Sequence, residues 1–140
     1  WILQDDYYEP VYGVKYAESK DGVYWERYPE LCIPQSHENE AFSHPTVLAT
    51  EDGYEMWYCY RDSVNYRAGG SGSYRIGYAH SEDGRKWVRA DQKKGFGVSE
   101  EDWEDKMVCY PFVVKDQGRM LMFYNGNGFG QGGIGVAEWV

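Results

Sequence analysis

An internal repeat constrains this chain more than any other feature. Residues 12–30 read YGVKYAESKDGVYWERYPE and residues 74–92 read YRIGYAHSEDGRKWVRADQ, with eight identical positions at an offset of 62. The identities include a Ser-x-Asp-Gly turn and the tryptophan that follows it. A third, shortened copy runs from Ile134 to Glu138 and matches the segment that starts at Ile76. A repeat of this kind predicts a fold built by stacking similar units.

A second element alternates with the first. Residues 44–62 resemble residues 110–128, because both contain Pro-x-Val near their start, a glycine turn and then an apolar and aromatic run. We align Met56-Trp57-Tyr58 with Leu121-Met122-Phe123, which gives a repeat period of 62–66 residues. The order along the chain is therefore a half repeat, a whole repeat and most of another.

Each repeat predicts four short antiparallel strands, which in the complete copy cover residues 45–49, 54–60, 74–81 and 86–90. Asp-Gly pairs between strands supply the positive φ that tight hairpins require. Four antiparallel strands in every ~40–65 residues are typical of propeller blades, so the sequence predicts an all-β fold of antiparallel four-stranded blades, a partial β-propeller. A β-sandwich with chance similarity is the alternative, and a parallel solenoid fits the hairpins less well.

The length predicts a single domain over residues 1–140. Within it, we assign residues 1–43 to the second half of one blade plus a linker. Residues 44–102 form a complete blade plus a linker, and residues 103–140 form most of a further blade.

Composition excludes several classes of function. The formal net charge of -9 argues against nucleic-acid partners and against binding to an anionic membrane surface. No apolar run approaches the ~20 residues of a membrane-spanning helix. Three cysteines, Cys32, Cys59 and Cys109, show no CxxC spacing and fit buried thiols in a reducing compartment. With no signal peptide visible at the start, we expect a cytoplasmic protein.

The repeated sequence segments resemble those of a known superfamily. Its elements P-x-V…D-G-x-x-M-W-Y and I-G-Y-A-x-S-x-D-G-x-x-W are similar to blades of the five-bladed propeller glycosidases, which include glycoside hydrolase families 43, 32 and 68 and the family 130 phosphorylases. More narrowly, the chain resembles glycosidase-like proteins of bacterial polysaccharide gene clusters. The Ser-x-Asp-Gly turns also resemble the sialidase Asp-box, from which they differ by lacking the residue between Asp and Gly.

The resemblance implies a five-bladed propeller of roughly twice this length. We therefore expect the chain to be the C-terminal part of such a protein, pairing with a copy of itself or with a missing N-terminal half. Alone it would leave sheet faces and edges exposed.

The resemblance also implies a sugar pocket at the starts of the blades. It places the candidate catalytic carboxylates at Glu40 and Asp105, because glycoside cleavage uses an acid and a base or nucleophile. Candidate substrate-binding residues lie before the repeated prolines and at the ends of the second strands: His44, Arg61, Asp62, Tyr110, Asn125 and Asn127. We expect no metal and no cofactor, and the NGNGFGQGG run lacks the pattern of a phosphate-binding loop.

Each of these assignments has an alternative. Glu40 lies in a polar, acidic stretch and fits a solvated loop carboxylate equally well. His44 fits a structural histidine, and Arg61 with Asp62 fits an internal ion pair. The predicted function is a carbohydrate-active propeller that acts on or binds a polysaccharide or oligosaccharide, with hydrolase activity favoured for the full-length protein and none expected of the isolated chain. A non-catalytic sugar-binding or assembly half-propeller is the alternative.

Overall fold

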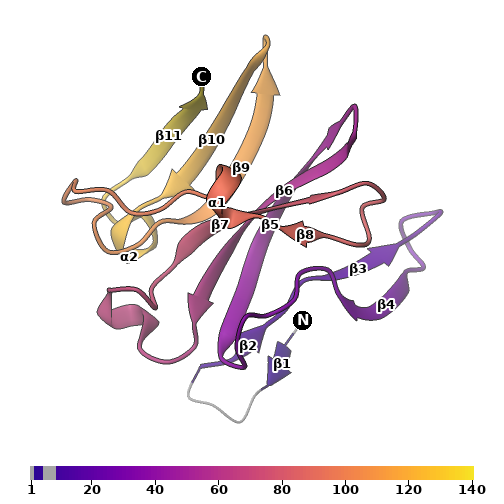
Figure 1. Ribbon diagram of the computed structural model, residues 1–140, viewed down its shortest axis with the longest axis horizontal. Coiled ribbons are helices and arrows are strands. Elements are labelled where there is room, and N and C mark those ends of the chain that lie inside the picture. The colour runs from indigo at the N-terminus through magenta and orange to yellow at the C-terminus, as the bar shows by residue number, and fades with distance from the viewer. Residues whose placement is uncertain (1, 5–8) are drawn as a thin grey trace.

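The computed structural model describes residues 2–4 and 9–140, and all of its sheets are antiparallel (Figure 1). Strand β1 (Ile2–Gln4) pairs with β2 (Val11–Tyr12), and β3 (Lys15–Glu18) pairs with β4 (Glu26–Leu31). A four-stranded sheet has the order β5 (Glu40–Thr50), β6 (Gly53–Asp62), β7 (Arg75–Ser81), β8 (Val88–Arg89). A three-stranded sheet has the order β11 (Ile134–Trp139), β10 (Arg119–Asn125), β9 (Cys109–Asp116). The prediction of a mostly-β, antiparallel chain is confirmed.

The helical segments are short and lie in the connections. They are the 3₁₀ turn η1 (Tyr66–Ala68), the four-residue helix α1 (Asp91–Lys94) and the segment labelled α2 (Asn127–Gly130), which is kinked because Gly128 and Phe129 have left-handed φ of 62° and 59°. Within the residues described, no helix is long or apolar enough to cross a membrane.

Two strands carry the same β-bulge. In β5 the pair His44-Pro45 lies opposite the single residue Tyr58, and in β9 the pair Tyr110-Pro111 lies opposite Tyr124. Sequence analysis placed the start of the first strand at Pro45, whereas β5 begins five residues earlier, at Glu40. The proline belongs to the bulge, where its missing N–H removes no regular ladder bond.

The bulges also correct the alignment of the second element. They equate Met56-Trp57-Tyr58 with Met122-Phe123-Tyr124, one residue later than the sequence alignment placed the match. Because side chains alternate between the two faces of a strand, a shift of one residue exchanges the faces. Two glycines support the corrected register: a Cβ on Gly77 would lie 2.5 Å from the Tyr58 ring, and one on Gly135 would lie 2.5 Å from the Tyr124 ring.

The two Ser-x-Asp-Gly turns have the same hydrogen bonds. The Gly22 N–H donates to Ser19 Oγ at 2.8 Å, and the Gly84 N–H donates to Ser81 Oγ at 2.9 Å. In both turns the aspartate Oδ1 accepts two further backbone N–H groups, and the tryptophan Nε1 donates to the glycine carbonyl. Gly22 and Gly84 have φ of 75° and 73°, which favours glycine. The repeat seen in the sequence is therefore a repeat of local structure.

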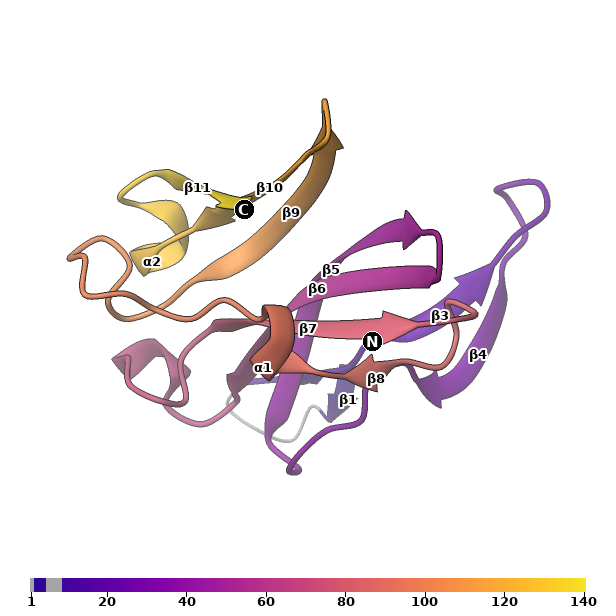
Figure 2. The same cartoon turned by 45° about the horizontal axis from the view of Figure 1, so that its top comes forward.

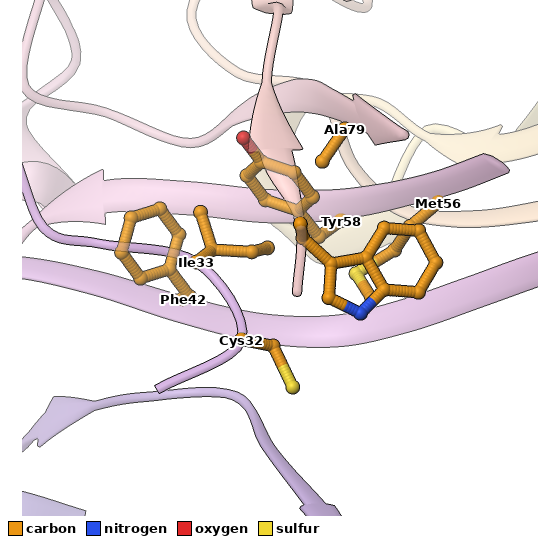
Figure 3. Packing of buried hydrophobic residues seen from close by; sticks show 7 residues of the cluster. Cys32, Ile33, Phe42, Met56, Tyr58 and Ala79 are labelled. Carbon is orange, nitrogen blue, oxygen red and sulfur yellow. The ribbon is translucent and has the colours of Figure 1, made fainter. Parts of the chain in front are cut away.

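The sheets lie side by side in chain order (Figures 1 and 2). Buried side chains between them form the core. One layer of side chains joins the loop after β4 to the four-stranded sheet, as Figure 3 shows for Cys32, Ile33, Phe42, Met56, Tyr58, Ala79. A second layer joins the four-stranded sheet to the three-stranded sheet, with Trp57, Ile76, Tyr78, Val108, Val113 and Tyr124 at its centre. Each such large side chain contributes ~1.5–3 kcal/mol when fully buried.

The outermost sheet leaves an apolar face uncovered in the part of the chain that is described. The exposed side chains of this face, named here the outer face, are Phe112, Phe123, Ile134 and Val136. The corrected register equates three of them with Trp57, Ile76 and Tyr78, which are buried against the next sheet. At the other end of the stack, Trp25 is 55% exposed, whereas the equivalent Trp87 is 8% exposed.

Candidate functional site

A pocket of about 460 Å³ opens beside the two bulges. Its walls come from segments that are far apart in the sequence, and its side chains are mainly aromatic or basic. The lining residues are Glu9, Tyr12, Ser43, His44, Arg61, Tyr66, Arg67, Tyr74, Tyr110 and Phe129. Aromatic faces and hydroxyl groups in one concave site are suited to binding a polar organic ligand.

The bulges bring His44 and Tyr110 together. Both have left-handed backbone conformations, with φ of 52° and 57°, and their ring centroids lie 5.1 Å apart. This conformation costs a non-glycine residue on the order of 1–3 kcal/mol, so the surrounding contacts must hold it. The Tyr110 N–H donates to Cys59 Sγ at 2.9 Å. Burial raises the pKa of the Tyr110 hydroxyl to about 12, which keeps it a neutral hydrogen-bonding group.

Arg61, near the end of β6, is the buried cation of the pocket and is 3% exposed. Its Nε donates to the Tyr74 hydroxyl at 3.1 Å. Its two Nη atoms donate to the Ser63 hydroxyl at 2.9 Å and to the Pro10 carbonyl at 3.0 Å. These bonds tie the segment before β2 to the end of β6 and fix the guanidinium in place.

The repeat supplies two of the walls around this cation. Tyr12 and Tyr74 are the first matched pair of the sequence alignment, and their ring centroids lie 5.8 and 5.7 Å from the Arg61 guanidinium carbon. Tyr66, from η1, lies closer, at 4.1 Å. Such cation–π contacts each stabilise the folded state by ~0.5–2 kcal/mol, so they help to fix the positions of the tyrosine rings and of the Arg61 guanidinium.

Arg67 and Glu9 form the more accessible part of the pocket. The Arg67 Nε donates to Glu9 Oε1 at 3.0 Å, and the Arg67 side chain is 62% exposed. The Tyr66 hydroxyl donates to the other Glu9 oxygen at 3.2 Å. The hydrogen bond from Arg67 is the main cause that lowers the Glu9 pKa, so this carboxylate is ionised at neutral pH.

Three of the residues predicted for substrate binding meet in this pocket, namely His44, Arg61 and Tyr110. The predicted ion pair between Arg61 and Asp62 is not formed by their side chains, because Arg61 reaches the Asp62 carbonyl at 3.4 Å and the Asp62 carboxylate accepts from the Val64 N–H at 2.7 Å.

Glu40 lies outside the lining of the pocket. Its carboxylate is buried and accepts hydrogen bonds from the Arg89 guanidinium at 2.8 and 2.9 Å and from the Ser36 N–H at 2.6 Å. Burial opposes ionisation, but the bonds from Arg89 and Ser36 outweigh it and lower the pKa. A solvated loop carboxylate, the alternative considered from the sequence, does not describe this environment.

The other three predicted residues organise loops. Asn127 Oδ1 accepts from the N–H groups of Lys106 and Met107 at 3.0 and 3.1 Å. Its Nδ2 donates to Asp105 Oδ1 at 2.6 Å. Asn125 donates to the Phe129 carbonyl at 3.1 Å, which holds the loop that presents Phe129 to the pocket.

Sequence analysis missed Glu9, Tyr12, Tyr66, Arg67, Tyr74 and Phe129 as lining residues. One signal was available for two of them: Tyr12 and Tyr74 open the matched repeats, at the equivalent place in each. Glu9 and Arg67 are 58 residues apart, and no local pattern pairs them.

Two other observations bear on the choice of site. The described residues bring together no group of three His, Cys, Asp or Glu side chains that could hold a metal ion. A wider hollow of about 760 Å³ lies beside Trp25 and the Ser19–Asp21 turn. We assign it to the uncovered end of the sheet stack, because the equivalent tryptophan, Trp87, is packed against a neighbouring layer.

Comparisons with known proteins identify bacterial relatives without an assigned role. No family model matches the chain. Two uncharacterised proteins of Mycobacterium tuberculosis, from strains CDC 1551 / Oshkosh and ATCC 25618 / H37Rv, are each 33% identical over 98% of this chain. The match covers 48% of either relative, so the chain spans about half the length of the curated proteins it matches.

Two solved structures share the fold. A protein described as a glycoside hydrolase matches with a TM-score of 0.69 at 20% identity, over 87% of this chain and 34% of its own length. A protein from a structure described as a BT0996 RGII complex matches with a TM-score of 0.66 at 19% identity, over 87% of this chain and 33% of its own length. The chain is therefore structurally similar to part of a glycoside hydrolase.

Proposed function

We propose that this chain forms part of a five-bladed β-propeller that binds a polysaccharide or oligosaccharide in the pocket beside the bulges. The sheets that carry the repeat support the propeller arrangement: they have the same bulge, the same Tyr-Gly contact and the same face-to-face packing order. The likeness to a third of a glycoside hydrolase chain supports it as well.

One observation carries the sugar-binding proposal. Two repeated bulges, each held in a left-handed conformation, place His44 and Tyr110 side by side in a pocket whose lining includes four tyrosines and Phe129. Aromatic faces pack against the C–H faces of sugar rings, while tyrosine hydroxyls, the Ser43 hydroxyl and the imidazole donate to or accept from sugar hydroxyls. Strained backbone at a concave site is a recurrent feature of functional positions.

The chemistry of the pocket favours binding as the role of this chain. Glycoside cleavage needs two carboxyl groups on either side of the bond, ~5–5.5 or ~6.5–9.5 Å apart. Among the described lining residues, Glu9 is the single carboxylate. The catalytic roles of Glu40 and Asp105 stay predictions, and the Arg89 pair favours a structural role for Glu40.

Hydrolysis is the second candidate, for a longer protein that contains this chain. The observation that favours it is the likeness to part of a glycoside hydrolase together with relatives of about twice this length. We propose that sheets outside this chain, or those of a second copy, would cover the outer face and add the carboxylates that the pocket lacks.

The test is sugar binding by the chain and by two variants. We expect saturation-transfer NMR to show contacts between the protein and a bound oligosaccharide from a panel of bacterial and plant glycans. The Tyr110→Ala change should abolish these contacts, whereas Tyr24→Ala, at an exposed tyrosine outside the pocket, should leave them unchanged. Binding that survives Tyr110→Ala, or that Tyr24→Ala removes equally, contradicts the proposed site. Release of reducing ends by the isolated chain would show that it is itself an enzyme.

A further inference from the structure

The charges of the pocket point to a narrower class of sugar. Its described lining residues include two arginines, Arg61 and Arg67, against one carboxylate, Glu9. The whole chain carries a formal net charge of -9, so this excess of positive charge is local. We infer that the pocket takes a sugar bearing a carboxylate, the chemistry of a uronic acid, and this inference rests on the proposed function.

The buried guanidinium of Arg61 supplies positive charge to the pocket. Within residues 2–4 and 9–140, no carboxylate oxygen lies within 4.0 Å of the Arg61 guanidinium, and its hydrogen-bond acceptors are neutral hydroxyl and carbonyl oxygens. A buried charge is costly unless an opposite charge compensates it. Arg61 therefore creates a positive potential in the pocket that a bound anion would relieve.

Arg67 provides the contact. Its guanidinium carbon lies 4.7 Å from the Tyr66 ring centroid and 5.9 Å from that of Phe129, so aromatic rings orient it at the rim. More than half of its side chain is exposed. A planar guanidinium donates two parallel N–H bonds to a carboxylate, which makes arginine selective for this group.

The balance of charge favours a carboxylate over a phosphate. Two guanidinium groups and the Glu9 carboxylate leave one positive charge, which a single carboxylate neutralises. A phosphate monoester carries about -1.5 to -2 at neutral pH and would leave the pocket negative. We therefore place the acid group of the sugar at Arg67, in the field of Arg61, with the sugar ring against the aromatic wall of Tyr110 and Phe129, whose ring centroids are 6.1 Å apart.

The experiment compares sugars that differ only in charge. Calorimetric titration of the chain would use trimers of galacturonic, glucuronic and mannuronic acid, each beside its carboxyl-reduced neutral counterpart, with galactose 1-phosphate and inorganic phosphate as the other anions. We expect at least one acidic trimer to bind about tenfold or more tightly than its neutral counterpart, because hydrogen bonds to charged groups are the stronger ones.

Variants assign the effect to the pocket. Arg67→Gln should remove the preference for the acid, whereas Arg119→Gln, at an exposed ion-paired arginine on β10 outside the pocket, should keep it. Glu9→Gln should strengthen acid binding, because it removes the competing carboxylate. The inference is overturned if neutral trimers bind as well as acidic ones, if a phosphate binds more tightly than every uronate, or if both arginine variants behave alike. Failure of every sugar, acidic and neutral, would instead refute the proposed function.

Discussion

The Arg89 guanidinium donates hydrogen bonds to both oxygens of the Glu40 carboxylate, at 2.9 and 2.8 Å. Arg89 also donates to Asp91 Oδ2 at 2.6 Å, and Asp91 Oδ1 accepts from the Tyr58 hydroxyl at 2.7 Å. The pair therefore links the start of β5 to β8 and α1 through a partly buried network. Side chains of this network connect the two edge strands of the four-stranded sheet, which favours a structural role for Glu40.

We predict that Glu40→Gln destabilises the fold by roughly 1–3 kcal/mol, because it removes the counter-charge of the partly buried Arg89 and leaves the substituted side chain buried beside it. The matched control is Glu138→Gln, which breaks the exposed pair with Arg119 and should cost far less, because solvent screens an exposed ion pair. Urea unfolding of the three proteins measures the difference. Equal losses for the two variants would contradict the structural role of Glu40.

The same pair predicts a dependence of stability on pH. The Glu40 pKa is lowered below its ordinary value of 4.5, because the bonds from Arg89 and Ser36 outweigh its burial. A group with a lowered pKa in the folded state contributes its full stability above the unfolded value, and the contribution falls as pH drops through the folded value. The stability difference between the chain and Glu40→Gln should thus be constant from about pH 5 to 7 and shrink below ~4.5. A difference that stays constant down to about pH 3 would show that Glu40 titrates normally.

The two equivalent tryptophans should respond differently to truncation. Trp87 is packed in the core layer against the loop after β4, so Trp87→Ala should cost ~3–5 kcal/mol. Trp25 makes the same Nε1 hydrogen bond but is 55% exposed, and we expect Trp25→Ala to cost under ~1 kcal/mol. Thermal or urea denaturation gives both values. A large loss at Trp25 would mean that a surface outside the described contacts covers it.

The exposed outer face predicts that the chain associates with other copies of itself in solution. Phe112, Phe123, Ile134 and Val136 expose apolar side chains together on one sheet face, which marks contact surfaces on proteins, and β11 is an edge strand of the sheet as described. Light scattering at micromolar concentration should therefore give a mass above 16.3 kDa. The double change Ile134→Lys with Val136→Lys should restore the monomer. A well-behaved monomer of the unmodified chain would argue against covered sheet faces.

Much of this fold could be predicted because it depends on local sequence patterns. The Ser-x-Asp-Gly turns and the hairpin between β5 and β6 are set by residues within a few positions of one another, and the structure has them where the sequence predicts them. The bulges were not predicted, because Pro45 and Pro111 were interpreted as the first residues of strands. Without the bulges, the alignment of the second repeated element was shifted by one residue, which assigned its side chains to the wrong face of the sheet. The ion pair of Glu40 could not be predicted from the sequence, because its partner Arg89 is 49 residues away. Long-range pairs of this kind leave no periodic trace in a single sequence.

The hairpin between β9 and β10 offers a prediction in which stability should rise. Asp116 pairs with Arg119 across a two-residue loop, Gln117-Gly118, and both loop residues have positive φ, 47° and 81°. This is the type I′ geometry, in which Asn-Gly is preferred because asparagine tolerates the left-handed region better than glutamine. Gln117→Asn should therefore stabilise the chain by about 0.5 kcal/mol, with Gln117→Val as the opposing control, since a β-branched residue is strained at this φ. Melting temperatures of the chain and the two variants measure the effect of each side chain on stability. A higher melting temperature for Gln117→Val than for Gln117→Asn would show that this turn does not adopt the I′ conformation in solution.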